Sequence, residues 1–166
     1  MVTKQGGTTL LQDPVAQKLL ASSNLARLAY SWTDGSPRVV PIWFHWNGQE
    51  VVFAGPTDHP KMTALRKDPR VAITIDDSST WPYTALLLRG TAVLDEVPGV
   101  AAEYASSALR YFGPEQGKAW VDTVGGLVQS MARMRVRPEW VAILDFEGRW
   151  PNAMERAMAA AGAAGR

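Results

Sequence analysis

The chain has 166 residues, of which 46% are hydrophobic and 20% are charged, and its formal net charge is +1 at pH 7. This length most simply forms one domain over 1–166 with a substantial core, and the charge balance indicates neither nucleic acid nor an anionic membrane as a partner. Cysteine is absent and histidine occurs twice, so the composition excludes disulfides and thiol catalysis and predicts no metal site.

The first half of the chain predicts a short helix followed by five strands. The helix begins at the N-cap residue Asp13, with Pro14 at the first helical position. Strands are expected over 24–32, 37–46, 50–54, 70–76 and 83–94, with a further short helix over 60–67. Asn47-Gly48 predicts a tight hairpin turn in which both residues take positive φ. The apolar strand over 37–46 is expected to be covered on both faces.

The second half of the chain changes character. Alanine and leucine at helical spacing predict helices over 98–111 and 114–134, so that a helical insert occupies about 98–135. A sixth strand follows over 137–146, and the alanine-rich tail over 152–166 predicts a short helix that is locally mobile. These elements predict a mainly β protein with helices (α+β), built on a six-stranded antiparallel barrel. A barrel of this size is filled by side chains, so a ligand would bind outside it, in a groove or between subunits.

The loop between the third strand and its following helix is the first candidate binding site. It contains Thr57, His59 and Lys61 immediately before and inside the helix start. Backbone N–H groups at a helix N-terminus and a nearby cation favour an anion, so this loop predicts a phosphate site. The alternative is that these residues are loop polar groups that cap the helix and a lysine that faces solvent.

Three segments resemble a known family. They read PRVVPIWFHWNGQEVVF, PTDHPKMTALRKDPRVAI and LLLRGTAVLDE, and with the strand RPEWVAILDF they cover about 24–96 and 137–146. They are similar to the split-barrel flavoproteins related to pyridoxamine 5′-phosphate oxidase, in particular to the actinobacterial branch that binds FMN or the deazaflavin F420. The resemblance implies a Greek-key-like split barrel and a homodimer with two cofactor sites at the subunit interface.

The resemblance also implies which residues hold the cofactor. The ring would lie along the strand containing Val39, Val40, Pro41, Ile42 and Trp43, and the phosphate would be held at Thr57, His59, Lys61 and Met62. The chain departs from the family in having His59-Pro60 where a Ser-Arg or Arg-Arg pair is common. It also has Gly148-Arg149-Trp150-Pro151 in place of the Arg-x-His that the oxidase uses for its pyridoxal substrate, so vitamin B6 oxidation is not expected.

Several residues allow a structural as well as a functional interpretation. Pro41 removes a ladder hydrogen bond, which favours an interrupted strand with open backbone groups over plain barrel core. Trp43 and Trp46 are expected to pack in the core or an interface, with ring stacking as the alternative. The basic residues Arg66, Lys67 and Arg70 form either a solvated face or a rim that attracts an anionic cofactor tail.

The sequence thus predicts an FMN-dependent oxidoreductase that acts on a small or planar organic substrate. The alternatives are an F420-dependent reductase and a non-catalytic carrier or sensor of flavin or haem. No catalytic residue is assigned, because no nucleophile and histidine have a credible triad spacing. The absence of an apolar run of about 20 residues and of an apolar signal-peptide centre predicts a cytoplasmic protein without a membrane span.

Overall fold

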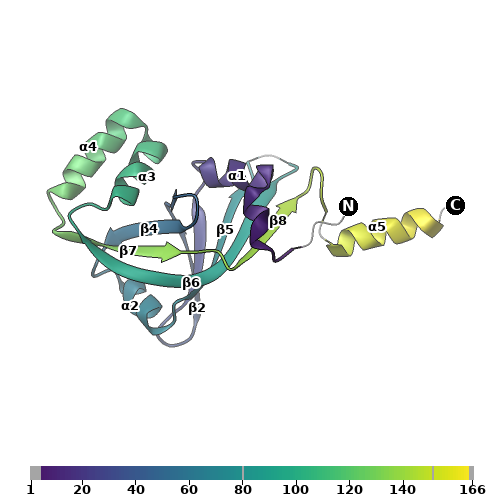
Figure 1. Ribbon diagram of the computed structural model, residues 1–166, viewed down its shortest axis with the longest axis horizontal. Coiled ribbons are helices and arrows are strands. Elements are labelled where there is room, and N and C mark those ends of the chain that lie inside the picture. Colours follow the sequence, from purple (N-terminus) through teal and green to yellow (C-terminus); the bar gives the residue numbers. More distant parts are fainter. Residues whose placement is uncertain (1–4, 80, 151, 165–166) are drawn as a thin grey trace.

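The computed structural model describes residues 5–79, 81–150 and 152–164, and shows a strongly curved antiparallel sheet with helices around it (Figure 1). The strands are β1 (Ala26–Ser31), β2 (Pro37–Ile42), β3 (His45–Trp46), β4 (Val51–Pro56), β5 (Arg70–Asp77), β6 (Thr84–Pro98), β7 (Ser130–Val136) and β8 (Trp140–Asp145). The helices are the 3₁₀-helix η1 (Thr8–Gln12), α1 (Pro14–Ala21), α2 (Pro60–Lys67), α3 (Ala102–Phe112), α4 (Pro114–Gly125) and α5 (Asn152–Ala164).

The sheet follows the order β2-β1-β5-β6-β7-β4-β3, and β8 pairs with the first half of β6. All of these pairs are antiparallel, which confirms the α+β antiparallel class. The long strand β6 bends through both halves of the molecule and leaves β8 for β7 near Gly90 (Figure 1). A Cβ on Gly90 would lie 2.5 Å from the carbonyl oxygen of Arg137, so the close approach of the two backbones requires glycine there.

The predicted number of six strands is wrong, because the sheet has eight strands within the described residues. One additional strand arises where the predicted strand over 37–46 divides into β2 and β3. The chain leaves the ladder at Trp43 and Phe44, and the Phe44 side chain is fully buried. The end strands β2 and β3 are consecutive in the chain but unpaired with each other, so the sheet is not closed on itself.

The other additional strand, β7, replaces the end of the predicted helical insert. Helix α4 ends at Gly125, and 130–136 pairs with both β4 and β6. Met131, Met134 and Val136 are buried, whereas Arg133 and Arg135 reach Asp95 of β6 across the ladder. Alanine, methionine and arginine favour a helix locally, but tertiary pairing overrides this weak preference. The insert is therefore helical over 102–125.

Two finer predictions about the second strand and its turn also differ from the structure. Strand β2 is not covered on both faces in this single chain, since Val39 is 65% exposed. At the following turn, Gly48 has positive φ (+96°) but Asn47 does not. The Asn47 Oδ1 instead accepts hydrogen bonds from the N–H groups of Gln49 and Glu50, at 2.9 and 2.8 Å. The hairpin is present, with a loop that the Asn47 side chain closes.

The main core lies inside the curved sheet. Its largest fully buried side chains include Leu28, Phe44, Phe53, Leu65, Ile73 and Leu86, together with Leu19 and Leu20 from α1. Asp13 caps α1 as predicted, with its Oδ1 accepting from the N–H of Val15 at 2.9 Å. A smaller cluster around Ala101, Val124 and Met131 holds α3 and α4 against β7.

The C-terminal helix α5 extends away from the rest of the molecule (Figure 1). It forms the tail helix predicted within 152–166, of which 165–166 lie outside the described residues. Met154 and Met158, one helical turn apart, are each about half exposed. None of the helices in the described part of the chain has the length and apolar character that crossing a membrane would require.

Candidate functional site

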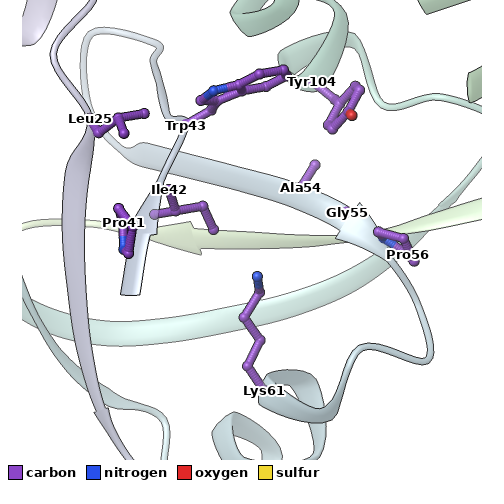
Figure 2. A pocket seen from close by; sticks show the side chains of 9 residues that line it. All are labelled: Leu25, Pro41, Ile42, Trp43, Ala54, Gly55, Pro56, Lys61 and Tyr104. Atoms are coloured by element: carbon purple, nitrogen blue, oxygen red, sulfur yellow. The ribbon is translucent and has the colours of Figure 1, made fainter. Parts of the chain in front are cut away.

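A cleft of about 350 Å³ opens where the sheet fails to close, between β2 and β4 (Figure 2). It is lined by Leu25, Pro41, Ile42, Trp43, Ala54, Gly55, Pro56, Lys61 and Tyr104. Residues from two strands thus face each other across the cleft, while Lys61 of α2 and Tyr104 of α3 lie at its opposite ends (Figure 2). A Cβ placed on Gly55 would meet no atom within 4 Å, so the space beside this residue is open.

The strand edges beside the cleft carry free backbone groups. In the described chain β2 pairs with β1 alone, and β3 covers β4 at Val51 and Val52 but not over 53–56. The other edge of β4 pairs with β7 over the whole of 51–56. Unpaired N–H and C=O groups on a strand edge can bond an added strand or a flat polar ligand. Pro41 lacks an N–H, which fits its place on such an edge.

Lys61 is the cationic group of this cleft. Its side chain rises from α2 toward the space between Pro41 and β4 (Figure 2), and burial lowers the pKa of its ammonium from the ordinary value of 10.5. Among the described residues that line the cleft it is the one cation, and its Nζ makes no hydrogen bond or ion pair within that part of the chain. A partly buried cation without a partner is unfavourable, so an anionic ligand group beside Nζ would stabilise it.

The first turn of α2 offers less to an anion than the sequence predicts. His59 caps the helix, and its Nδ1 accepts from the N–H of Lys61 at 3.4 Å. The N–H of Met62 donates to the His59 carbonyl at 2.8 Å, and Pro60 has no N–H. The Met62 side chain is buried in the protein interior. Any anion held here would therefore rely on the Lys61 side chain rather than on backbone groups of this turn.

The other predicted phosphate residues lie outside the cleft lining. Thr57 borders a neighbouring cavity of about 320 Å³ with Asp58 and the segment 127–130. His59 is exposed, and burial followed by the charge of Lys61 lowers the pKa of its imidazole below the ordinary value of 6.5. A neutral imidazole keeps the Nδ1 lone pair that caps α2.

The predicted ring-binding strand is divided between the cleft and other surroundings. Pro41, Ile42 and Trp43 line the cleft. Val40 packs against the main core, and the exposed Val39 faces away from it. Within a single chain, only the segment 41–43 of the predicted strand is therefore in a position to contact a ligand in the cleft.

Of the three basic residues after Lys61, two are bonded elsewhere and the third is exposed. Arg70 makes a bidentate pair with Asp68, with Nε–Oδ1 and Nη2–Oδ2 distances of 2.9 and 2.8 Å. The Lys67 ammonium donates to the Thr33 carbonyl at 2.6 Å, and Arg66 is exposed. These side chains lie outside the cleft lining, which favours their interpretation as a solvated face.

One end of the cleft has an aromatic wall that the sequence did not predict. Its rings are those of Trp43, Tyr104, Tyr111 and Phe112. Trp43 stacks on Tyr111 (centroids 5.5 Å apart, interplanar angle 12°) and meets the edge of Phe112 at 4.9 Å. The ring centroids of Tyr104 and Trp43 are 5.8 Å apart. The Tyr104 hydroxyl accepts a hydrogen bond from the Trp120 indole N–H at 2.9 Å. The spacing of Tyr104 and Tyr111, seven residues apart on a helix, places them on one face and could have indicated such a wall.

Helix α3 is positioned over the cleft by the break between β2 and β3. The Phe44 carbonyl, freed from the ladder there, accepts hydrogen bonds from Ser107 Oγ (3.0 Å) and from the Arg110 guanidinium. Glu103 pairs with Arg133 of β7 at 3.0 Å. The helix that carries Tyr104 is thereby attached to both halves of the sheet.

The strand order and the open seam beside the cleft define a split antiparallel barrel. The sequence profile of pyridoxamine 5′-phosphate oxidase matches residues 13–144. The chain therefore belongs to the pyridoxamine 5′-phosphate oxidase family, which confirms the resemblance of its strand and loop motifs. A search of proteins with curated functions found no match.

Solved structures give the same fold. An F420 reductase shares 28% sequence identity, with a TM-score of 0.59 over 76% of this chain and 94% of the other. A conserved hypothetical protein from Mycobacterium tuberculosis shares 22% identity, with a TM-score of 0.66 over 87% of this chain and 91% of the other. A haem storage protein from Vibrio cholerae shares 17% identity, with a TM-score of 0.58 over 80% and 93%. The latter two similarities show the fold alone.

Proposed function

We propose that the protein is an FMN-dependent oxidoreductase of small or planar organic substrates, with the cofactor in the cleft between β2 and β4. The observation that carries the proposal is Lys61, a partly buried cation that faces an open cleft and has no partner among the described residues. A phosphate at Nζ would supply the missing negative charge.

The walls of the cleft suit the rest of such a cofactor. The free edges of β2 and β4 can hydrogen-bond the polar edge of a flat heterocycle, and Ile42 and Ala54 supply apolar contacts. The cofactor supplies the hydride chemistry, whereas the protein binds it, orients it and limits the access of water. Pro41, Ile42 and Trp43 would orient the ring, and Lys61 would hold its phosphate. No catalytic residue is assigned.

A second copy of the chain would complete this site. The exposed strand β2, with Val39 65% exposed beside the cleft, is a surface that a homodimer would cover. In this proposal the two cofactors bind at the interface, where the partner limits the access of solvent to the open side of each cleft.

An F420-dependent reductase is the second candidate, and the 28% identity to an F420 reductase favours it. We favour FMN over F420, because the described lining residues include one cationic side chain. One cation matches the single phosphate of FMN better than the longer anionic tail of F420. A haem carrier is less well supported, because His59 caps α2 and both His59 and His45 lie outside the cleft lining.

The test is a titration of the purified full-length protein with FMN, riboflavin, F420 and haemin, followed by flavin fluorescence or visible absorption. We expect saturable FMN binding that is tighter than riboflavin binding, because riboflavin lacks the phosphate. The preference for FMN over riboflavin should disappear in Lys61→Met. Tighter binding of F420 would favour the second candidate, and absence of saturable binding by all four ligands would refute a cofactor role for the cleft.

Oxidoreductase activity needs a separate measurement. The loaded protein should transfer electrons from a chemically reduced cofactor to an organic acceptor faster than free FMN does under the same conditions. A protein that binds FMN tightly but gives no acceleration with a panel of planar acceptors would be a carrier instead.

A further inference from the structure

We infer that the Tyr104 end of the cleft is a substrate subsite for a planar conjugated molecule that carries a hydrogen-bond acceptor, such as a ring ketone, and that the Tyr104 hydroxyl recognises this acceptor. The inference rests on the proposed function for its place in the reaction, because the cofactor phosphate occupies the opposite, Lys61 end. The binding subsite itself can be tested without a cofactor.

The two ends of the cleft differ in polarity. Lys61 approaches from α2 at one end, and Trp43 and Tyr104 lie together at the other (Figure 2). The Lys61 end therefore favours an anion, whereas the other end presents two aromatic rings whose centroids are 5.8 Å apart. Aromatic side chains bind flat conjugated molecules through stacking and edge contacts.

Trp43 is held in place by residues behind the cleft. Tyr111 stacks on its ring and Phe112 meets it edge-on, while the Tyr111 hydroxyl donates to the Asn24 carbonyl at 2.9 Å. A wall whose rings are already packed loses little conformational freedom when a ligand binds. The surface is thus preorganised for a planar molecule.

The Tyr104 hydroxyl has a defined free donor. An indole N–H can only donate, so in the 2.9 Å contact with Trp120 the Tyr104 oxygen accepts. The hydroxyl proton is then available for another acceptor, and within the described residues it makes no such hydrogen bond. A ligand acceptor at this end of the cleft can take this proton in place of water, which favours a carbonyl or a similar group over a plain hydrocarbon.

The test compares two flat ligands of nearly equal size, 1-indanone and indane, which differ by one carbonyl. Their binding to the full-length protein without cofactor is followed by chemical-shift changes of the tryptophan indole N–H signals. We expect 1-indanone to bind roughly three- to tenfold more tightly than indane, the scale of one hydrogen bond. The preference should be lost in Tyr104→Phe and reduced in Trp120→Phe, which no longer orients the hydroxyl.

Tyr111→Phe is the matched control, because it removes a hydroxyl that bonds Asn24 outside the cleft and should keep the preference. Thermal unfolding of each variant identifies any loss of folding. A carbonyl preference that survives in Tyr104→Phe, or that falls equally in Tyr111→Phe, would overturn the inference.

The test of this subsite and the test of the proposed function can fail independently of each other. The preference for FMN over riboflavin should persist in Tyr104→Phe, because the phosphate contact belongs to Lys61 at the other end of the cleft. Lys61-dependent FMN binding together with a Tyr104-independent carbonyl preference would overturn this inference alone. A Tyr104-dependent preference in a protein that binds no flavin would support the subsite and refute the flavin function.

Discussion

At the scale of single residues, Lys61 connects stability with function. Burial lowers the pKa of its ammonium, which means that the surroundings disfavour the charged form. Burial of the ammonium without a partner among the described residues is therefore an unfavourable contribution in the ligand-free protein. A residue that destabilises an empty site and gains a partner on binding is typical of functional sites.

Lys61→Met should therefore separate the two effects. We expect the melting temperature of the ligand-free variant to be equal to or higher than that of the unchanged protein, because a similar apolar chain replaces an unpaired charge. FMN binding should weaken by roughly 1.5–3 kcal/mol, the scale of a charge-assisted hydrogen bond. Calorimetry and fluorescence titration measure the two quantities.

Lys67→Met is the control for this prediction. Lys67 belongs to the same helix but bonds the Thr33 carbonyl away from the cleft, so FMN affinity should not change. If both variants lose affinity equally, the effect is general surface charge rather than a phosphate contact. If Lys61→Met destabilises the ligand-free protein, the account of an unfavourable charge is wrong.

His59 gives a prediction for the dependence of stability on pH. Its pKa is lowered in the folded protein, so near pH 6.5 the unfolded chain binds more protons than the folded chain. The free energy of unfolding should therefore fall as the pH falls from about 7.5 through this window. The effect should be small because His59 is exposed.

His59→Asn should make this pH dependence shallower, because asparagine caps a helix without titrating. Thermal melts between pH 7.5 and 5.5 would measure the change. His45 should account for part of the remaining slope, since burial also lowers the pKa of its imidazole. An unchanged slope in His59→Asn would show that its titration does not contribute.

At the scale of elements, the pair α3 and α4 depends on one close backbone contact. A Cβ on Gly117 of α4 would lie 2.7 Å from both the Ala108 carbonyl oxygen and the Leu109 Cα of α3. Helices that approach this closely need glycine, because neither backbone can move aside independently. The contact brings Trp120 within hydrogen-bond distance of Tyr104.

Gly117→Ala should therefore lower the free energy of unfolding by roughly 1–3 kcal/mol, the usual range for overpacking. Gly125→Ala is the control in the same helix, because its Cβ would meet Val100 at an ordinary 3.6 Å. That variant should be neutral or more stable by up to about 1 kcal/mol, since alanine favours a helix. Equal destabilisation by both changes, measured by urea unfolding, would contradict the close-contact argument.

At the scale of the whole molecule, the open seam of the sheet is the feature from which the proposed function follows. The same break that separates β2 from β3 leaves the cleft between β2 and β4 and exposes the face that carries Val39. If a second copy covers this face, cofactor affinity and dimerisation should be coupled.

Val39→Asp should weaken self-association by about tenfold or more, because a dimer would bury the new charge without a partner. Sedimentation velocity measures the dimer, and FMN affinity should fall with it. Val93→Asp, on a half-exposed residue of β6 outside the cleft lining, serves as a surface control. A dimer that persists unchanged in Val39→Asp would show that β2 is not the interface.

The sequence determined the elements whose signals are local. Asp13-Pro14 started α1 and Pro60 started α2, because capping and proline geometry act within one turn of the chain. The β-branched residues of β5 and the apolar run of β6 predicted strands over 70–76 and 83–94, because such composition is also a local signal. The motifs around Lys61 identified the family, which the profile match over 13–144 confirms.

The tertiary structure decided what depends on distant partners. Whether 130–136 became a helix or a strand was set by β4 and β6 on either side of it, and the division of 37–46 was set by burial of Phe44 beneath α3. Tyr104 joined the cleft because contacts with Phe44, Arg133 and Gly117 position its helix. Local propensities amount to fractions of a kcal/mol per residue, whereas such long-range pairing and burial contribute more, so a cleft assembled from separate segments is settled only when the chain folds.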